Sequence, residues 1–274
     1  MSPTDPFGTA VRASLVLSAR TRVECALQVA VARRRGVEVL EESLAVTREG
    51  EPVELLEDVD RLGGRLHAFS AGKGTTRVDY SARVRVDPGA ADTALTPRER
   101  WQFTRPSRYC ESDRLAAVAA AEFVGTDRAE LPAAVTAWVH ERLDYVSGSS
   151  DPTDGAVDTL LAGQGVCRDH AHLVVALLRA LDVPARLVAV YAPGLEPMDF
   201  HAVVEAAPDD RWQLQDATRL APRASLLRIS TGRDAADTAF LSNTGITTLE
   251  EMEVLAVAEG DLPAEEPAAL VRLA

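Results

Sequence analysis

The hydrophobic pattern of this 274-residue chain changes its period once, near residue 90. Before that point apolar and polar residues alternate, as in RVECALQV at 22–29 and RVDYSARVRV at 77–86. Alternation with period two is typical of strands that bury one face. Gly63-Gly64 and Gly72-Lys73-Gly74 interrupt the alternation as turn signals. We therefore predict short antiparallel strands joined by hairpins, which form a small β-sandwich over residues 1–90.

A helical period follows the turn-rich residues 87–92. Helices are predicted over residues 113–124 and 130–143, and a third begins at or beside Cys167, because Leu173, Leu177 and Leu181 share one stripe. Pro184 ends this third helix, since proline lacks a backbone N–H. Short strands are then expected at residues 185–191, 200–206, 211–216 and 251–258. The acidic tail, residues 259–274, contains prolines and is expected to be loose.

The charge of the chain argues against two classes of partner. A formal net charge of −13 repels nucleic acid and anionic membrane surfaces. The one tight basic cluster, Arg33-Arg34-Arg35, precedes Gly36 and is interpreted as a solvated turn. We therefore expect neither nucleic-acid nor membrane binding.

Cysteine usage and the N-terminal residues bear on location. Three widely spaced cysteines encode no disulfide framework. The first ten residues, MSPTDPFGTA, lack the charged and apolar regions of a signal peptide, and no apolar run is long enough for a membrane span. The expectation is a soluble cytoplasmic protein with reduced thiols.

Cys167 stands where a cysteine can be activated, in the stretch GQGVCRDHAHL at residues 163–173. A thiol attacks carbonyls as the thiolate, which is favoured at a helix N-terminus or beside an imidazolium. Gly163 and Gly165 allow a tight turn into the helix, and Asp169 suits the positive end of its dipole. The alternative is that Cys167 is a small buried hydrophobe.

A nucleophilic thiolate needs a general base, and His201 is the best placed of the five histidines. It enters a predicted strand, so a sheet packed against the helix could present it to Cys167. The other four histidines fit less well: His67 belongs to the sandwich, His140 covers a helix surface, His170 shares the helix of Cys167, and His172 points about 140° away from it.

The base in turn needs an orienting carboxylate. Asp216 ends the strand one hairpin after His201, and alternation puts it on one face with Trp212 and Leu214. Its alternative role is to initiate the turn before Ala217-Thr218. Glu205 is a rival, but it lies two pleats further along the strand of His201.

These residues together resemble the transglutaminase-like superfamily of papain-type cysteine enzymes. The matching stretches are Gly163-x-Gly165-Val166-Cys167-x-Asp169, Ala176 to Val188 around Val183-Pro184, His201-Ala202, Trp212, and Asp216-x-Thr218. Weaker similarity reaches Trp138-Val139 and Tyr145 upstream and Gly232-Arg233-Asp234 downstream. Two departures, Val203 after His201-Ala202 and Leu181-Asp182-Val183 before the proline, concern the shape of the substrate pocket.

The resemblance implies an α+β fold: a papain-like or transglutaminase-like core at residues 107–258, in which a Cys-bearing helix packs on an antiparallel sheet. In bacterial members of the superfamily a β-sandwich precedes such a core. The resemblance also implies Cys167 as nucleophile, His201 as base and acid, and Asp216 as orienting carboxylate. No cofactor and no metal are implied.

The expected reaction is acyl transfer from an amide of a peptide or protein substrate through a Cys167 thioester. Hydrolysis is preferred because water needs no second binding site, while an amine acceptor would make the protein a transglutaminase. The backbone N–H of Cys167 is expected to hold the oxyanion, with Gln164 a weak candidate for the second donor. Two alternatives stay open: a non-enzymatic binding relative, and a zinc site formed by Cys167, His170, His172 and His201, whose spacing is irregular for zinc.

Overall fold

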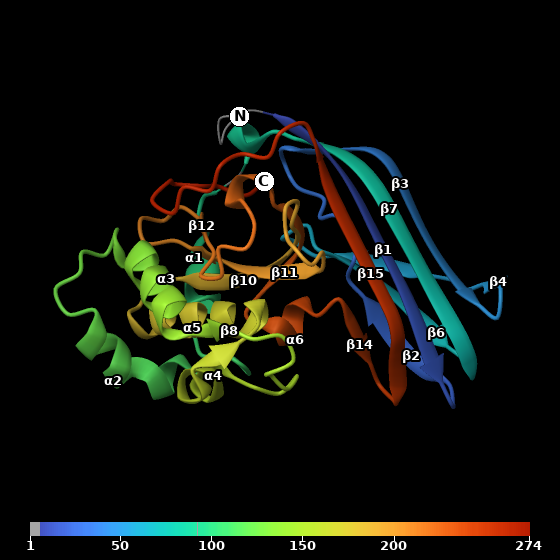
Figure 1. The fold of residues 1–274 in the computed structure, drawn as a ribbon, viewed down its shortest axis with the longest axis horizontal. Coiled ribbons are helices and arrows are strands. Elements are labelled where there is room, and N and C mark those ends of the chain that lie inside the picture. Colours follow the sequence, from blue (N-terminus) through green and yellow to red (C-terminus); the bar gives the residue numbers. More distant parts are fainter. Residues whose placement is uncertain (1–5, 92) are drawn as a thin grey trace.

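The computed structural model describes residues 6–91 and 93–274. Residues 1–5, on which the signal-peptide argument partly rests, and Asp92, in the predicted boundary turn, lie outside the described residues. The chain forms a β-rich part of long strands and a second part in which helices cover a smaller sheet (Figure 1). The predicted α+β class, a sandwich followed by a helix-on-sheet core, is confirmed.

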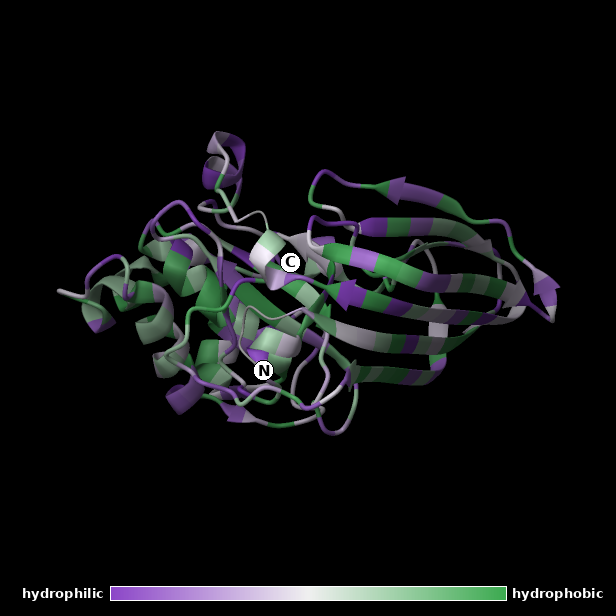
Figure 2. Cartoon of the chain, turned by 90° about the horizontal axis from the view of Figure 1, so that it is seen from above, coloured by the Kyte–Doolittle hydropathy of each residue, from purple (hydrophilic) through white to green (hydrophobic). Residues whose placement is uncertain are grey.

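Two antiparallel sheets build the sandwich. One has the order β15-β1-β7-β3-β4 and the other β14-β2-β6-β5. Their strands are β1 (Phe7–Ala19), β2 (Val23–Leu27), β3 (Val37–Arg48), β4 (Glu51–Pro52), β5 (Leu56–Val59), β6 (Arg65–Ala71), β7 (Gly74–Val86), β14 (Leu241–Asn243) and β15 (Thr247–Glu259). Every second residue of β7 is buried, as the alternation predicts, and Figure 2 shows the matching bands of hydropathy along the strands.

The connections differ in part from the predicted hairpins. Gly63 and Gly64 lie in the turn between β5 and β6, which pair as a hairpin. The turn at residues 72–73 instead carries the chain from β6 in one sheet to β7 in the other. The predicted hairpin there was wrong, because an alternating pattern shows that a strand has a buried face without showing which strand is its partner.

The predicted strand at 251–258 forms as part of β15, but it does not join the sheet of His201. It pairs with β1 along its whole length, from Gly8↔Glu259 to Ala19↔Thr247. In Figure 1 the red β15 lies beside the blue β1, so the first and the last strand of the described residues share one sheet. The sandwich is therefore completed by residues that the predicted division assigned to the core.

The second part centres on a four-stranded sheet with the order β12-β11-β10-β13. Its strands are β10 (Ala185–Tyr191), β11 (Phe200–Ala206), β12 (Gln213–Gln215) and β13 (Leu227–Gly232). The helices are α1 (Pro97–Gln102), α2 (Ser112–Glu122), α3 (Leu131–Arg142), α4 (Ala156–Ala162), α5 (Cys167–Ala180) and α6 (Ala235–Thr238). Short elements complete it: β8 (Asp144–Tyr145), β9 (Gln164–Gly165) and the 3-10 turns at Pro88–Ala90 and Arg223–Ser225.

Helix α5 is the most deeply buried helix of this part. Its residues from Asp169 to Arg179 are all buried, and it packs against β10 and β11 as well as α2, α3 and α4. The three predicted helices correspond to α2, α3 and α5, and α5 begins at Cys167. None of the helices in the described ranges is long and apolar enough to cross a membrane.

The last residues of the chain are packed, so the expectation of a loose tail was wrong. Val271 and Leu273 are buried in an apolar cluster with Val188, Val203 and Leu214. The backbone N–H of Leu214 donates to Val271 over 2.8 Å. The apolar residues of the tail cover one face of the sheet, and this burial outweighs the polar composition that suggested disorder.

A buried ion network crosses the same sheet. Glu205 on β11 accepts hydrogen bonds at 2.7 to 2.9 Å from Arg186 and Arg228, and all three side chains are almost completely buried. Burial alone would raise the pKa of Glu205, but the two guanidinium groups lower it to about 2. Arg186 also bonds Glu99 at 2.8 Å and stacks on the Trp212 ring. Each buried charge is thus matched by a partner of opposite sign.

Replacement of Glu205 should therefore destabilise the fold strongly. In Glu205→Gln two buried arginines lose their shared carboxylate, at a cost of about 3–5 kcal/mol. Urea unfolding measures this cost. The matched change Glu251→Gln, at an exposed position of β15, should alter the free energy of unfolding by less than about 0.5 kcal/mol. Similar losses in the two variants would contradict the role given to the network.

Candidate active site

Two glycines shape the approach to α5, as the sequence predicts. Gly163 ends α4 in the left-handed conformation, with φ 67°. At Gly165 a Cβ atom would lie 2.6 Å from the Cβ of Asp169, so no larger residue fits without a shift. Asp169 accepts the N–H of Val166 at 2.8 Å and closes the first turn of the helix. The sequence thus places Cys167 at the first helical position with a capped N-terminus behind it.

His201 and Asp216 are brought together by the register of β11 and β12. Val204 pairs with Gln215, so Asp216 follows the end of β12 on the face that also carries His201. Nε2 of His201 lies 2.8 Å from Oδ2 of Asp216, and both side chains are buried. Thr218 fixes the carboxylate by donating its N–H at 2.8 Å and its hydroxyl at 2.7 Å to Oδ1.

The electrostatics of His201 are set by its two neighbours. Burial by itself lowers the pKa of the ring, but Asp216 and Cys167 outweigh burial and raise the pKa to about 10. The pKa of Asp216 is lowered, because the His201 charge and the hydrogen bonds from His201 and Thr218 overcome the effect of burial. His201 is therefore an imidazolium at neutral pH. Its contribution to stability is complete below about pH 6.5 and is lost as the pH rises through about 10.

Nδ1 is the ring nitrogen of His201 that does not face Asp216. It is buried, and within the described residues it has no conventional hydrogen-bond partner. Cys167 interacts with the same ring and is half-buried, whereas Cys25 and Cys110 are buried. Burial raises the pKa of Cys110 to about 12 and also raises that of Cys25. Of the three thiols, Cys167 alone is partly exposed and also contributes to the raised pKa of His201.

The neighbouring histidines on α5 have other partners. Nδ1 of His170 lies 3.0 Å from the Val166 carbonyl, and Nε2 of His172 accepts the Ala235 N–H at 3.1 Å. Burial lowers the pKa of both rings, that of His172 to about 4. Nowhere in the part of the chain that the structure describes do three potential metal ligands gather. Both histidines are scaffold residues in this structure.

The other residues that the sequence analysis considered for the site also lie outside the His201–Asp216 pair. Glu205, the rival carboxylate, is occupied by Arg186 and Arg228. His67 lies 3.5 Å from Glu57 in the sandwich, and Nδ1 of His140 lies 2.7 Å from the Ala217 carbonyl. Gln164 is exposed on β9, and no hydrogen bond of its side chain occurs among the described residues.

Tyr145 is a functional candidate that sequence reasoning named only as part of the resemblance. Strands β8 and β9 pair in parallel, with Tyr145 opposite Gly165, two residues before Cys167. Its ring packs on His170, and the backbone of Cys167 is near enough to the phenol to lower its pKa. Burial and the nearby charges of Cys167 and Asp199 raise the pKa of Tyr145 to about 12, so the phenol keeps its proton at neutral pH. The parallel bridge that positions Tyr145 leaves no periodic signal in two-residue strands.

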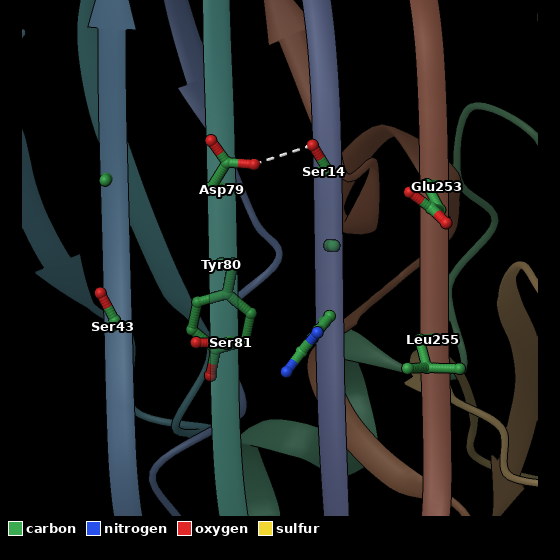
Figure 3. Close-up of a pocket in the computed structure, with 10 residues that line it drawn as sticks. Ser14, Ser43, Asp79, Tyr80, Ser81, Glu253 and Leu255 are labelled. Carbon is green, nitrogen blue, oxygen red and sulfur yellow. Dashed lines mark hydrogen bonds between the residues drawn. The ribbon is translucent and has the colours of Figure 1, made fainter.

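A separate hollow of about 440 Å³ lies on the outer face of the five-stranded sheet (Figure 3). Small side chains such as Ser14, Ser43 and Ser81 leave this space open, and Ser14 donates to Asp79 at 2.8 Å. Its lining residues come from β1, β3, β7 and β15. The hollow therefore belongs to the sandwich and shares no residue with the site around Cys167.

The sequence of the chain is also similar to that of known proteins. A family description, the transglutaminase-like superfamily, matches residues 118–217. An uncharacterized protein of Mycobacterium leprae, ML0607, is 28% identical over 130 residues, which are 43% of this chain and 46% of that protein. The chain thus matches less than half the length of this curated relative.

A solved structure gives the more extensive similarity. It is a candidate cysteine protease from Cytophaga hutchinsonii, 32% identical, with a TM-score of 0.88. The similarity covers 97% of this chain and 96% of that one, so both the sandwich and the helix-covered sheet are shared. The chain belongs to the transglutaminase-like superfamily.

Proposed function

We propose that this protein is a cysteine-dependent hydrolase of amide bonds in peptides or proteins, with Cys167 as nucleophile, His201 as acid and base, and Asp216 as the orienting carboxylate. The observation that carries the proposal is the buried His201 ring, whose Nε2 lies 2.8 Å from Asp216. Asp216 and Cys167 together raise the pKa of this ring to about 10, which favours the imidazolium. An imidazolium beside a thiol favours the thiolate, which is the nucleophilic form. Similarity to a candidate cysteine protease supports the same reaction class.

In the first step the Cys167 thiolate attacks the amide carbonyl carbon. A carbon–sulfur bond forms, and the carbonyl electron pair moves to oxygen. As the tetrahedral intermediate collapses, the carbon–nitrogen bond breaks, and His201 gives its proton to the departing amine. The acyl group remains bound as a thioester to Sγ of Cys167, the first residue of α5.

In the second step water resolves the thioester. His201, now neutral, takes a proton from water as the hydroxyl attacks the thioester carbon. The carbon–sulfur bond breaks, the carboxylic acid leaves, and the thiolate–imidazolium pair is restored. Asp216 keeps Nε2 of the ring engaged throughout, which leaves Nδ1 for proton transfer.

The oxyanion of both steps needs two hydrogen-bond donors. The first is the backbone N–H of Cys167 at the start of α5. We propose the Tyr145 hydroxyl as the second, because the phenol lies near the backbone of Cys167 and stays protonated at neutral pH. Gln164 is less suitable, since its side chain is exposed on β9.

Two further parts of the proposal come from the sequence. Water is preferred to an amine as acceptor, since it requires no second binding site. A cytoplasmic location is proposed on the basis of three free cysteines, none of which is paired in a disulfide.

The first prediction concerns the reactivity of Cys167. Iodoacetamide should alkylate Cys167 at a rate that is nearly constant between about pH 6 and 9, because the His201 imidazolium persists over that range. In His201→Ala the rate at pH 7 should fall on the order of tenfold and rise with pH through about 8.5, as for an ordinary thiol. Mass spectrometry of the labelled peptides measures both rates.

Cys25 and Cys110 are internal controls in this experiment, because both are buried and should react slowly in either protein. Their low rates alone would reflect burial, so the decisive comparison is Cys167 with and without His201. Equal pH profiles in the two proteins would favour a non-enzymatic relative.

The acceptor is tested with a glutamine-containing peptide and a labelled primary amine. We expect the wild-type protein to release the hydrolysed product in excess over the amine-linked product, and Cys167→Ala to release neither. Chromatography with mass detection separates the two products. Efficient incorporation of the amine would overturn the preference for hydrolysis and make the protein a transglutaminase.

Tyr145→Phe tests the second oxyanion donor. The loss of one such donor should lower kcat about a hundredfold or more, with little change in KM. Alkylation of Cys167 by iodoacetamide should be unaffected, because that reaction forms no oxyanion. The matched variant Tyr109→Phe removes a hydroxyl from a ring that stacks on His172 instead. This variant should keep the activity of the wild type. Equal kcat values for the two variants would exclude Tyr145 from the oxyanion site.

A further inference from the structure

A cavity of about 400 Å³ lies where loops of the sandwich meet the helix-covered part. Arg34 and Arg61 line it from the sandwich side. Thr96 and Arg98, at the start of α1, line it from the other part, and Arg186 and Trp212 reach it from the four-stranded sheet. Four arginines thus line one space in a protein whose net charge is −13.

Two of these arginines are available to a ligand. Arg98 is exposed, and Arg61 donates to the neutral side chain of Gln102. In the ranges that the structure describes, neither of them forms an ion pair with a carboxylate. Some surface arginines elsewhere are paired, as Arg100 is with Asp210 and Arg85 with Glu38. Arg61 and Arg98 therefore keep positive charge that the protein itself does not neutralise.

The inner wall of the cavity holds a second unmet group. Trp212 is 2% exposed, and its indole N–H has no hydrogen-bond partner among residues 6–91 and 93–274. A buried N–H without a partner costs about 1–3 kcal/mol. The neighbouring Arg186 is satisfied by Glu99 and Glu205 and covers the Trp212 ring at 3.8 Å. Among the described residues that line the cavity, the one carboxylate belongs to Glu99, which is itself engaged by Arg186 and Thr96.

We propose that this cavity binds the oxyanion group, phosphoryl or carboxylate, of a small molecule. Every unmet group that the cavity offers is a donor, and two of them are guanidinium groups, which bind such oxygens in a bidentate manner. Trp212, a residue of the wall, has in its indole N–H a further donor without a partner. The volume lies within the range of small-molecule sites, about 300–1,000 Å³, so there is room for a molecular body beyond the anionic group.

This site is distinct from the one around Cys167. Arg186 pairs with Glu205 at one end of β11, whereas His201 lies four residues away near the other end, about 13 Å along the strand. No residue that lines the cavity belongs to the proposed reaction. Anion binding at this site can therefore be tested independently of the activity of Cys167.

The experiment is a calorimetric titration of the whole protein with pyrophosphate and, separately, with citrate, each at constant ionic strength. We expect saturable binding of at least one anion, with a Kd below about 1 mM. In Arg61→Gln/Arg98→Gln the affinity should fall at least tenfold. Preference for pyrophosphate identifies a phosphoryl ligand, and preference for citrate a carboxylate ligand.

The matched control is Arg77→Gln/Arg85→Gln, which removes the same charge from the outer face of the sandwich. It should bind as the wild type does. An equal loss of affinity in this control would show that only net charge matters and would overturn the proposal, as would the absence of saturable binding to both anions.

A second measurement locates the ligand. The chain has three tryptophans, so its proton NMR spectrum contains three indole N–H signals. Spectra of Trp101→Phe and Trp138→Phe assign these signals by elimination. The anion should move the Trp212 signal and leave Trp101, which is exposed, and Trp138, which bonds Glu122, in place. Binding that left the Trp212 signal unmoved would place the anion elsewhere and overturn the proposal.

Discussion

Two carboxylates are buried at the four-stranded sheet, that of Glu205 on β11 and that of Asp216 just after β12. They differ in the residues that neutralise them, and this difference separates a stabilising role from the proposed catalytic role. Glu205 is held by Arg186 and Arg228, whose charge is permanent at any physiological pH. Asp216 is held by His201, whose charge can change when a proton is transferred. A buried carboxylate paired with two arginines stabilises the sheet but takes no part in proton transfer, because the arginines keep their protons. A buried carboxylate with one histidine stabilises an imidazolium, and in the proposed reaction this imidazolium activates Cys167, so the proposed reactive end of the sheet depends on the titratable partner.

Cys167 reaches that end because a short parallel bridge fixes the segment before it. Pairing of Asp144 with Gln164 and of Tyr145 with Gly165 holds the strand that enters α5. The absent side chain of Gly165 lets Asp169 close on the backbone behind the cysteine. The same pairing puts Tyr145 opposite Gly165, two residues before Cys167. One local structure therefore sets the helix start, the thiol and a neutral hydrogen-bond donor.

Local features of the sequence predict the elements, while pairing between distant segments decides their neighbours. The helix start at Cys167, the turn at Gly163 and the strand of His201 follow from short-range patterns, and the structure has all three. The partner of β15 could not be predicted in this way, because a strand that alternates fits either sheet and its partner β1 is more than 200 residues away. The tail likewise has a polar composition but buries Val271 and Leu273. The turn assigned to Arg33-Arg34-Arg35 contains one residue, Arg34, whose place at a cavity depends on segments far along the chain.

The sandwich also contributes to the position of His201, although it supplies none of the proposed reacting groups. Tyr191 pairs with Phe200, the residue before His201, and its hydroxyl donates to the Val29 carbonyl at 2.8 Å. Tyr191 belongs to the apolar core of the sandwich, and Phe200 packs against it and against Phe240. The strand that carries His201 therefore begins against the core of the sandwich. The His201 ring must stay within hydrogen-bond distance of Asp216. Because the sandwich holds the start of the strand that carries His201, it helps to maintain this distance.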